Sequence, residues 1–174
     1  MSLSPIAVVG PSGAGKDLLM SGAVAERPEL YLLRRVITRP SSAGGEDFEG
    51  VSDEEFAKRA EAGEFALHWQ AHGLRYGIPK AEFARPGRAL MNLSRAVLPQ
   101  AQALWPDLKV LHVTAPPEVL AARLAGRGRE TAASQGARLA RASLEMPAGI
   151  VVQEVMNDAS PELGLRRFLA ALSL

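Results

Sequence analysis

Short apolar runs alternate with amphipathic segments along the chain, and this alternation predicts the elements of the fold. The apolar runs predict strands at about 5–9, 31–37, 88–93, 109–114 and 150–155. The amphipathic segments predict helices at about 16–26, 95–104, 116–126, 134–145 and 160–172. Such alternation is typical of a parallel sheet covered by helices. The sequence therefore predicts a three-layer α/β fold.

Two segments interrupt the alternation and read as insertions into the parallel core. Residues 38–84 contain a predicted helix capped by Ser52, with Glu55 three residues later, and a hairpin-like stretch over 65–76. The second segment, 126–130, mixes arginine with helix-breaking glycine. This composition suits a mobile lid.

Length and composition narrow the class of protein. The 174 residues suffice to bury a core, and we see no internal repeat or linker, so 1–174 is expected to be a single domain. The absence of cysteine excludes disulfides, thiolate zinc sites and a catalytic cysteine. A net charge of +1 gives no support for nucleic-acid binding, and no apolar segment is long enough to cross a membrane. Because the residues after Met1 do not form a signal peptide, we expect a cytoplasmic protein.

A glycine-rich motif lies where the first predicted strand meets the first predicted helix. Its residues are Gly10, Pro11, Ser12, Gly13, Ala14, Gly15, Lys16 and Asp17. The pattern G-x-x-x-x-G-K in this position is typical of a P-loop, whose backbone N–H groups and following helix dipole bind phosphate. Lys16 is expected to reach the outer phosphates of a nucleotide. The alternative is a glycine-rich turn that binds no ligand.

Asp17 departs from the usual P-loop, in which Ser or Thr follows the lysine and binds magnesium through its hydroxyl. A carboxylate can also bind Mg²⁺, although it adds negative charge beside the phosphates. We therefore predict a metal-binding role for Asp17. The alternative is an acid that is stabilised only by the helix dipole.

Arginines cluster around the predicted lid. Arg123, Arg127 and Arg129 precede or lie within the glycine-broken stretch, and Arg138 and Arg141 follow at a spacing that shares one helical face. Phosphoryl transfer needs positive groups around the transferring phosphate, and guanidinium groups are planar, permanently charged donors. The cluster is therefore predicted to converge on that phosphate. A solvated helical face is the alternative.

Polar residues follow two predicted strands, at the edge where ligands bind in open parallel sheets. Arg39 follows the strand ending near residue 37, where it either anchors an anion or lies on the surface. Asn92, Ser94 and Arg95 end the next core strand and are suited to bind a sugar or order magnesium-bound water. For Ser94, helix capping is the alternative.

Histidine chemistry is not indicated. His68, His72 and His112 lack the spacing of metal ligands, and we assign them no role. The nearby aromatic residues are expected to pack in the interior rather than to stack on a base. Tyr76 is the exception, because its hydroxyl beside Gly77 can reach a phosphate.

Several motifs, in order, give the chain a resemblance to the guanylate kinase superfamily from end to end. Besides the P-loop and the arginine lid, they are Thr38-Arg39-Pro40, Gly63-Glu64-Phe65, His72-Gly73, Tyr76-Gly77 and Asn157-Asp158. The resemblance implies a nucleoside-monophosphate-kinase fold, with an acceptor-binding insertion over 38–84 and a lid over 126–138. It also implies that Arg39 and Tyr76 bind the acceptor phosphate and that Asn157-Asp158 lies near the nucleotide base.

The chain departs from guanylate kinases at the acceptor site. Ser42 stands where they carry a second arginine, and Gln70 stands where they carry the glutamate that reads guanine. A neutral amide cannot accept both guanine N–H donors as a carboxylate can. Asn92 and Ser94 replace their two aspartates after the third strand. Specificity for guanine is therefore expected to be lost.

The same departures resemble the ribose 1,5-bisphosphate phosphokinases of phosphonate breakdown. The shared motifs are G-P-S-G-x-G-K-D at 10–17, I-T-R at 37–39, N-x-S-R-A at 92–96, L-P-Q-A at 98–101, R-G-R-E at 127–130 and A-R-L-A-R-A at 137–142. They extend over nearly the whole chain. Enzymes of this family transfer the γ-phosphoryl group of ATP to the anomeric phosphate of ribose 1,5-bisphosphate and form phosphoribosyl diphosphate and ADP.

This resemblance implies a division of roles, with ATP and Mg²⁺ as cofactors and a phosphorylated sugar as substrate. The residues for ATP and its transfer are the P-loop with Lys16, Asp17 for the metal, and Arg127 and Arg138 for the transition state. The acceptor contacts are Arg39, Tyr76, Asn92, Ser94 and Arg95, and the base contact is Asn157. A guanylate kinase and a non-catalytic guanylate-kinase-like interaction module remain as alternatives, and the sequence leaves the oligomeric state open.

Overall fold

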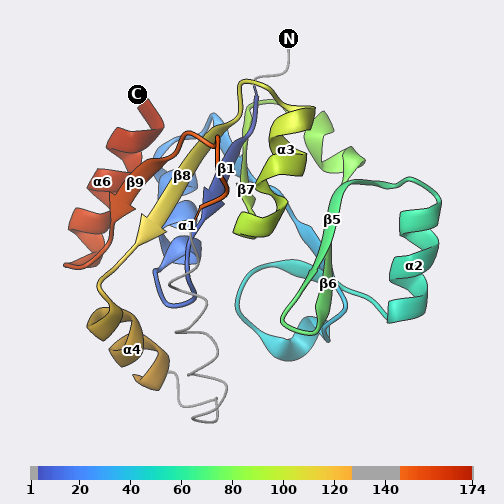
Figure 1. Ribbon diagram of the computed structural model, residues 1–174, viewed down its shortest axis with the longest axis horizontal. Helices are drawn as coiled ribbons and strands as arrows, with labels where there is room; N and C mark the ends of the chain where they lie inside the picture. Colours follow the sequence, from blue (N-terminus) through green and yellow to red (C-terminus); the bar gives the residue numbers. More distant parts are fainter. Residues whose placement is uncertain (1–3, 127–145, 174) are drawn as a thin grey trace.

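Strands far apart in the sequence pair to form a parallel sheet. In the computed structural model, which describes residues 4–126 and 146–173, the strand order is β2-β7-β1-β8-β9 and all neighbours run parallel. These strands are β1 (Ile6–Val9), β2 (Leu30–Leu32), β7 (Arg88–Asn92), β8 (Lys109–Thr114) and β9 (Gln153–Met156). The parallel α/β fold predicted from the alternation is confirmed (Figure 1).

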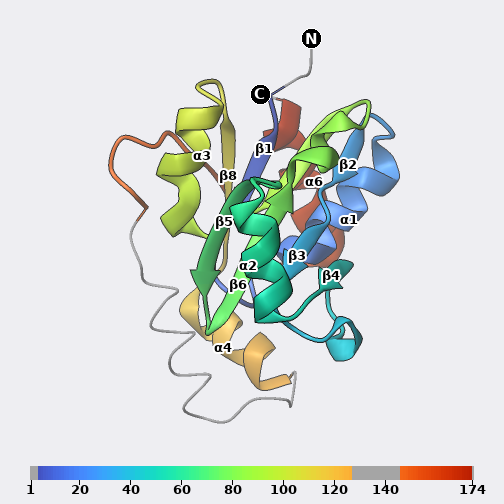
Figure 2. The same cartoon turned by 90° about the vertical axis from the view of Figure 1, so that its right-hand side faces the viewer.

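Helices cover both faces of this sheet. On one face, α1 (Lys16–Glu26) packs with α6 (Pro161–Ser173). On the other face lies α3 (Leu98–Leu104). Figure 2 shows β1 and β8 between these two helical layers. The helix α4 (Pro117–Gly126) follows β8 and packs beside the glycine-rich loop.

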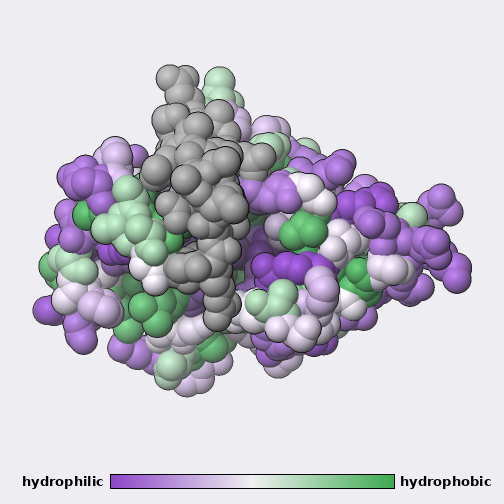
Figure 3. Space-filling view, turned by 90° about the horizontal axis from the view of Figure 1, so that it is seen from below, coloured by the Kyte–Doolittle hydropathy of each residue, from purple (hydrophilic) through white to green (hydrophobic). Residues whose placement is uncertain are grey.

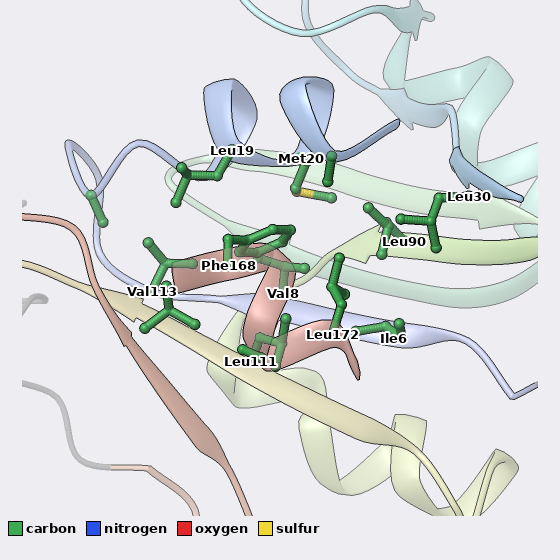
Figure 4. Close-up of a cluster of buried hydrophobic side chains, with 14 of the residues drawn as sticks. Ile6, Val8, Leu19, Met20, Leu30, Leu90, Leu111, Val113, Phe168 and Leu172 are labelled. Carbon is green, nitrogen blue, oxygen red and sulfur yellow. The ribbon is translucent and has the colours of Figure 1, made fainter. Parts of the chain in front are cut away.

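Alternation along β1 lets one strand serve both faces of the sheet. Ile6 and Val8 point into the cluster formed with α1 and α6, whereas Ala7 and Val9 point into the cluster formed with α3. In the first cluster, Phe168 of α6 is fully buried against the sheet (Figure 4). Full burial of such a side chain contributes about 1.5–3 kcal/mol. This contact therefore fixes α6 against the sheet.

A second, smaller sheet forms largely within the predicted insertion. Its order is β4-β3-β6-β5, with strands β3 (Arg35–Ile37), β4 (Phe48–Gly50), β5 (Phe65–Ala71) and β6 (Leu74–Pro79). Beside it lies α2 (Asp53–Glu61), whose predicted cap is confirmed: the Glu55 N–H donates to the Ser52 hydroxyl at 3.1 Å. The predicted hairpin is also confirmed, since β5 and β6 meet at a His72-Gly73 turn with φ angles of 54° and 73°.

The prediction of a single strand at 31–37 is wrong. This run forms β2 in the large sheet and β3 in the small sheet. The Leu33 N–H still donates to the Leu90 carbonyl of the large sheet at 3.1 Å, whereas the Arg34 N–H donates to Glu82 Oε2 at 3.0 Å. The chain therefore crosses from one sheet to the other at these two residues, and the inserted sheet begins before residue 38.

Other boundaries differ slightly from the predicted ones. The helix predicted at 95–104 starts as a 3-10 helix before α3 begins, and the last core strand starts at Gln153, later than predicted. The 3-10 helices are Ser41–Ala43, Lys80–Ala84 and Arg95–Val97. The helix predicted at 134–145 lies outside the described residues. Within the described part of the chain, no helix has the length and apolar character that a membrane crossing requires.

Candidate functional site

The glycine-rich loop connects the end of β1 to the start of α1 and fits closely against β8. A Cβ atom at Gly10 would overlap the carbonyl oxygen of Val113, so this position excludes a side chain. Gly13 and Gly15 have φ angles of 87° and 89°, in the left-handed region that favours glycine. The loop conformation thus depends on the three glycines that the motif places there.

The start of α1 is suited to bind an anion. Gly15 is the N-cap residue and supplies no side-chain acceptor for the first N–H groups of the helix. Such N–H groups and the positive end of the helix dipole form a phosphate site. The Lys16 ammonium folds back over the loop and donates to the carbonyls of Gly10 at 2.6 Å and Pro11 at 3.2 Å. The cation is therefore held directly above the loop.

One cavity of about 1080 Å³ joins the loop to the small sheet. The predicted site residues that line it are Gly10, Pro11, Ser12, Gly13, Gly15, Lys16, Asp17, Arg39, Tyr76, Asn92, Ser94, Arg95 and Asn157. Ala14 is buried behind the loop, and Arg127 and Arg138 lie outside the described residues. Figure 3 views the molecule from this side, where hydrophilic side chains gather over α2 and the adjoining part of the small sheet.

Asn92 and Asp17 meet at the edge of the large sheet. Because β7 pairs with β1 in parallel, with Asn92 opposite Val8, the end of β7 lies beside the loop. The Asn92 amide donates to the exposed Asp17 carboxylate at 3.3 Å. Among the described residues, no group of three or more His, Asp or Glu side chains forms a metal cluster. A lone carboxylate still suits Mg²⁺, which commonly keeps several waters and binds one or two carboxylates together with substrate phosphates.

Arg39 lies across the cavity from the loop. Its guanidinium stacks on Phe48, with 4.4 Å from Cζ to the ring centroid, and donates to the Gly44 carbonyl at 3.0 Å. Its Nε is buried and has no hydrogen-bond partner within the described residues. A charged donor in this position is suited to bind an anion.

Two further residues that line the cavity, Ser94 and Arg95, follow the end of β7. Ser94 precedes the 3-10 helix, and its side chain makes no capping hydrogen bond there. Arg95 is half-buried, and this burial lowers the pKa of its guanidinium from the ordinary value. His112, on β8 beyond β1, has a lowered pKa because burial and the charge of Arg95 oppose its protonation.

The sequence analysis missed Arg35 and Glu46. Arg35 is the one buried charged residue among the described positions, with 8% of its surface exposed. Its Nε donates to Glu46 at 2.9 Å, and its Nη1 donates to the Asn92 carbonyl at 3.2 Å. An arginine two residues before the end of an apolar run was the available signal, but it was assigned to one long strand.

Asn157 is buried beneath the glycine-rich loop. Its side-chain amide donates to the Ala14 carbonyl at 2.7 Å, and its main-chain carbonyl accepts from the Arg123 guanidinium at 2.7 Å. Glycine at positions 15 and 164 leaves room for it, since a Cβ atom at either would collide with its amide group. The structure therefore gives this amide a loop contact, in addition to its place on the cavity wall.

Two residues next to Asn157, Arg123 and Asp158, have different surroundings. Arg123 also donates to the Gly13 carbonyl at 3.1 Å, so it connects α4, the loop and the end of β9. Asp158 is exposed and pairs with Arg167 of α6 at 2.9 Å. Of the two residues expected near the base, Asn157 alone lines the cavity.

Comparison with known sequences places the chain among phosphokinases. It is 60% identical over 159 residues to the ribose 1,5-bisphosphate phosphokinase PhnN of Ruegeria sp. (strain TM1040), a match that covers 89% of this chain and 84% of that protein. It is 45% identical to the protein of the same name from Rhizobium etli (strain CIAT 652), over 96% of this chain and 88% of that one. No profile of a known protein family matches.

A third relative is longer. The bifunctional ribose 1,5-bisphosphokinase-thymidine phosphorylase of Cupriavidus necator is 46% identical over 95% of this chain, which spans 28% of that protein. The similarity is therefore confined to a part of that relative.

Solved structures agree on the fold. A guanylate kinase from Anaplasma phagocytophilum superimposes with a TM-score of 0.64 at 19% identity, over 99% of this chain and 86% of that one. A gluconokinase from Sinorhizobium meliloti 1021 gives a TM-score of 0.57 at 18% identity, over 98% and 91%. The fold is that of a P-loop NTPase. With the identities above, the chain belongs to the ribose 1,5-bisphosphate phosphokinase family.

Proposed function

We propose that this chain transfers the γ-phosphoryl group of ATP to the 1-phosphate of ribose 1,5-bisphosphate, which gives 5-phosphoribosyl 1-diphosphate and ADP. The observation that carries the proposal is the cavity of about 1080 Å³ that is lined both by the phosphate-binding loop and by Arg39 and Tyr76. The identity of 60% to a ribose 1,5-bisphosphate phosphokinase supports this choice of acceptor.

The reaction requires the protein to position the two substrates and to stabilise negative charge, and it requires no general base. An oxygen of the acceptor 1-phosphate is already anionic; it bonds to the γ-phosphorus while the bond from that phosphorus to the β-phosphate oxygen breaks. Lys16 and the N–H groups at the start of α1 are positioned to hold the outer phosphates. Bound Mg²⁺ would offset phosphate charge. Asp17, oriented by the Asn92 amide, is the carboxylate we propose for that metal.

We assign the contacts to the acceptor to residues that line the cavity outside the glycine-rich loop. The buried Nε of Arg39, which lacks a partner within the described residues, supports a role in binding a phosphate of the sugar. We assign the Tyr76 hydroxyl, Ser94 and Arg95 to the same substrate, because all three residues line this cavity. For Asn92, which also lines the cavity, we keep the proposed acceptor contact and add the role of orienting Asp17. For Arg127 and Arg138, outside the described residues, we retain the proposed role of stabilising the transition state.

Ribose 1,5-bisphosphate is expected to be the preferred acceptor of the purified protein. ADP release should be measured with ribose 1,5-bisphosphate, ribose 5-phosphate, GMP and AMP at saturating ATP and Mg²⁺. Ribose 5-phosphate is the matched control, since it lacks the 1-phosphate that receives the phosphoryl group. An equal or higher kcat/KM for GMP would reject the assignment in favour of a guanylate kinase. Absence of ADP release with every acceptor would favour an interaction module.

Asp17 is expected to set the magnesium requirement. Asp17→Asn should raise the Mg²⁺ concentration needed for half-maximal transfer, because it removes a metal-binding carboxylate beside the phosphates. Asp17→Ser should retain more activity than Asp17→Ala, since a hydroxyl can make the usual P-loop metal contact. Asp53→Asn is the matched control, because Asp53 is also an exposed acid in the first turn of a helix. Identical Mg²⁺ titrations for wild type and Asp17→Ala would leave Asp17 only a helix-dipole role.

A further inference from the structure

Arg35 is a buried charged residue, and each of the three nitrogens of its guanidinium donates a hydrogen bond. It makes a two-point ion pair with Glu46, through Nε at 2.9 Å and through Nη2, and the two side chains are only 10% and 20% exposed. Nη1 donates to the Asn92 carbonyl of the large sheet. Paired contacts of this kind fix both the position and the plane of a guanidinium. Arg35 and Glu46 therefore form a rigid part of the cavity wall, which both residues line.

The Arg35 guanidinium covers one face of the Tyr76 ring, with Cζ 4.9 Å from the ring centroid. Trp69 stacks on the same ring with its centroid 5.5 Å away and the planes 7° apart. The strand order places β6 between β3 and β5, and Ile37 and Trp69 both pair with Tyr76. Arg35, two residues before Ile37, shares its face of the sheet. Arg35 and Trp69 therefore flank Tyr76 from opposite sides.

A tyrosine enclosed in this way has no free ring face. A planar base gains binding energy by stacking on an exposed aromatic face. In this cavity Tyr76 presents only its edge and its hydroxyl, while the pair of opposite charges beside it is already satisfied internally. Such a wall suits a non-planar, phosphorylated acceptor and leaves a base no uncovered face of Tyr76 to stack on.

We propose that the Arg35–Glu46 pair determines acceptor specificity by covering Tyr76 and so excluding nucleotides from the acceptor site. The inference rests on the proposed function and assigns to this pair the discrimination between a sugar phosphate and a nucleoside monophosphate. Arg35 acts here through Tyr76, as a positioning residue, and its guanidinium is not assigned to the substrate.

The test compares wild type with Arg35→Ala/Glu46→Ala, which removes both charges and leaves no unpaired one. We expect the double variant to bind GMP and AMP about tenfold more tightly or better, a factor in keeping with one gained base stack. Titration calorimetry with GMP and AMP, in the absence of ATP, measures this directly. The ratio of kcat/KM for ribose 1,5-bisphosphate to that for GMP should fall, mainly through a lower KM for GMP.

The neighbouring pair Arg34 and Asp47 supplies the matched control. These side chains are also joined by an ion pair, at 3.2 Å, but are 48% and 86% exposed and do not contact Tyr76. Arg34→Ala/Asp47→Ala is therefore expected to leave nucleotide binding unchanged. Glu46→Gln, a milder change that keeps Arg35, should shift the same ratio in the same direction by a smaller factor and serves if the double variant does not fold.

The outcomes separate this inference from the proposed function. A merely structural role for the pair would lower kcat for every acceptor and would create no nucleotide binding. If folded variants bind GMP and AMP no better than wild type and keep the wild-type ratio, the specificity role is overturned. If wild type does not use ribose 1,5-bisphosphate at all, the proposed function fails, and the calorimetric comparison still decides whether the pair excludes nucleotides.

Discussion

Lys16→Ala is expected to reduce ATP-dependent transfer by about 10²–10³-fold, the usual effect of removing one preorganised group that stabilises developing charge. The Lys16 ammonium lies above the loop, 2.6 Å from the Gly10 carbonyl, where the outer phosphates are proposed to bind. No other described lysine lines this cavity. The loss should therefore not be compensated within that part of the chain. The measurement is kcat and kcat/KM from ADP release with ribose 1,5-bisphosphate.

Folding must be monitored alongside this loss. Lys16 is only partly buried and contacts carbonyl groups at the surface of the loop, so Lys16→Ala should keep a Tm close to that of wild type. Lys58→Ala is the matched control, since Lys58 is exposed on α2, away from the cavity. Turnover of Lys16→Ala close to that of wild type at saturating substrates would remove Lys16 from the mechanism.

Asn157→Ala is expected to lower the free energy of unfolding by about 1–3 kcal/mol, the cost of leaving a buried polar group without its partner. The group in question is the Ala14 carbonyl, which accepts from the Asn157 amide at 2.7 Å; Asn157 is 6% exposed and Ala14 is fully buried. Because this bond holds the phosphate-binding loop from below, the KM for ATP should rise as well. Urea denaturation and ATP kinetics give the two quantities.

Two comparisons sharpen the Asn157 experiment. Asn157→Asp should be at least as harmful as Asn157→Ala, because a carboxylate oxygen would face the Ala14 carbonyl oxygen. Asp158→Asn changes the exposed neighbour that pairs with Arg167 and should cost about 1 kcal/mol or less. If Asn157 served only as a base contact, the variants would change the preference for ATP over GTP and leave the unfolding free energy unchanged.

The features that were best predicted from the sequence are those formed by residues close together along the chain. The P-loop needs glycines and a lysine at fixed spacing between a strand and a helix, so Gly10 to Lys16 identified both a loop and its position at the sheet edge. The alternation of elements predicted the parallel sheet for the same reason. The hairpin over β5 and β6 and the Ser52 cap were also local features, and both are present.

What depends on contacts between distant segments was not predictable. Arg35 was assigned to one long strand, because two adjacent arginines in an apolar run do not by themselves distinguish one strand from two strands in different sheets. Its partners, Glu46 and the Asn92 carbonyl, become neighbours only after the small sheet has formed. Likewise, Asn157 was expected near a base, and its bond to Ala14 joins residues 143 positions apart.

The space around Asn157 also limits how the enzyme can be engineered. Gly164 lies within α6, where exchanging a helical glycine for alanine commonly stabilises a protein by about 0.5–1 kcal/mol. At this position the added methyl group would collide with the Asn157 amide and displace it from the loop. Thermostabilisation of α6 must therefore use its other positions, or change residues 157 and 164 together.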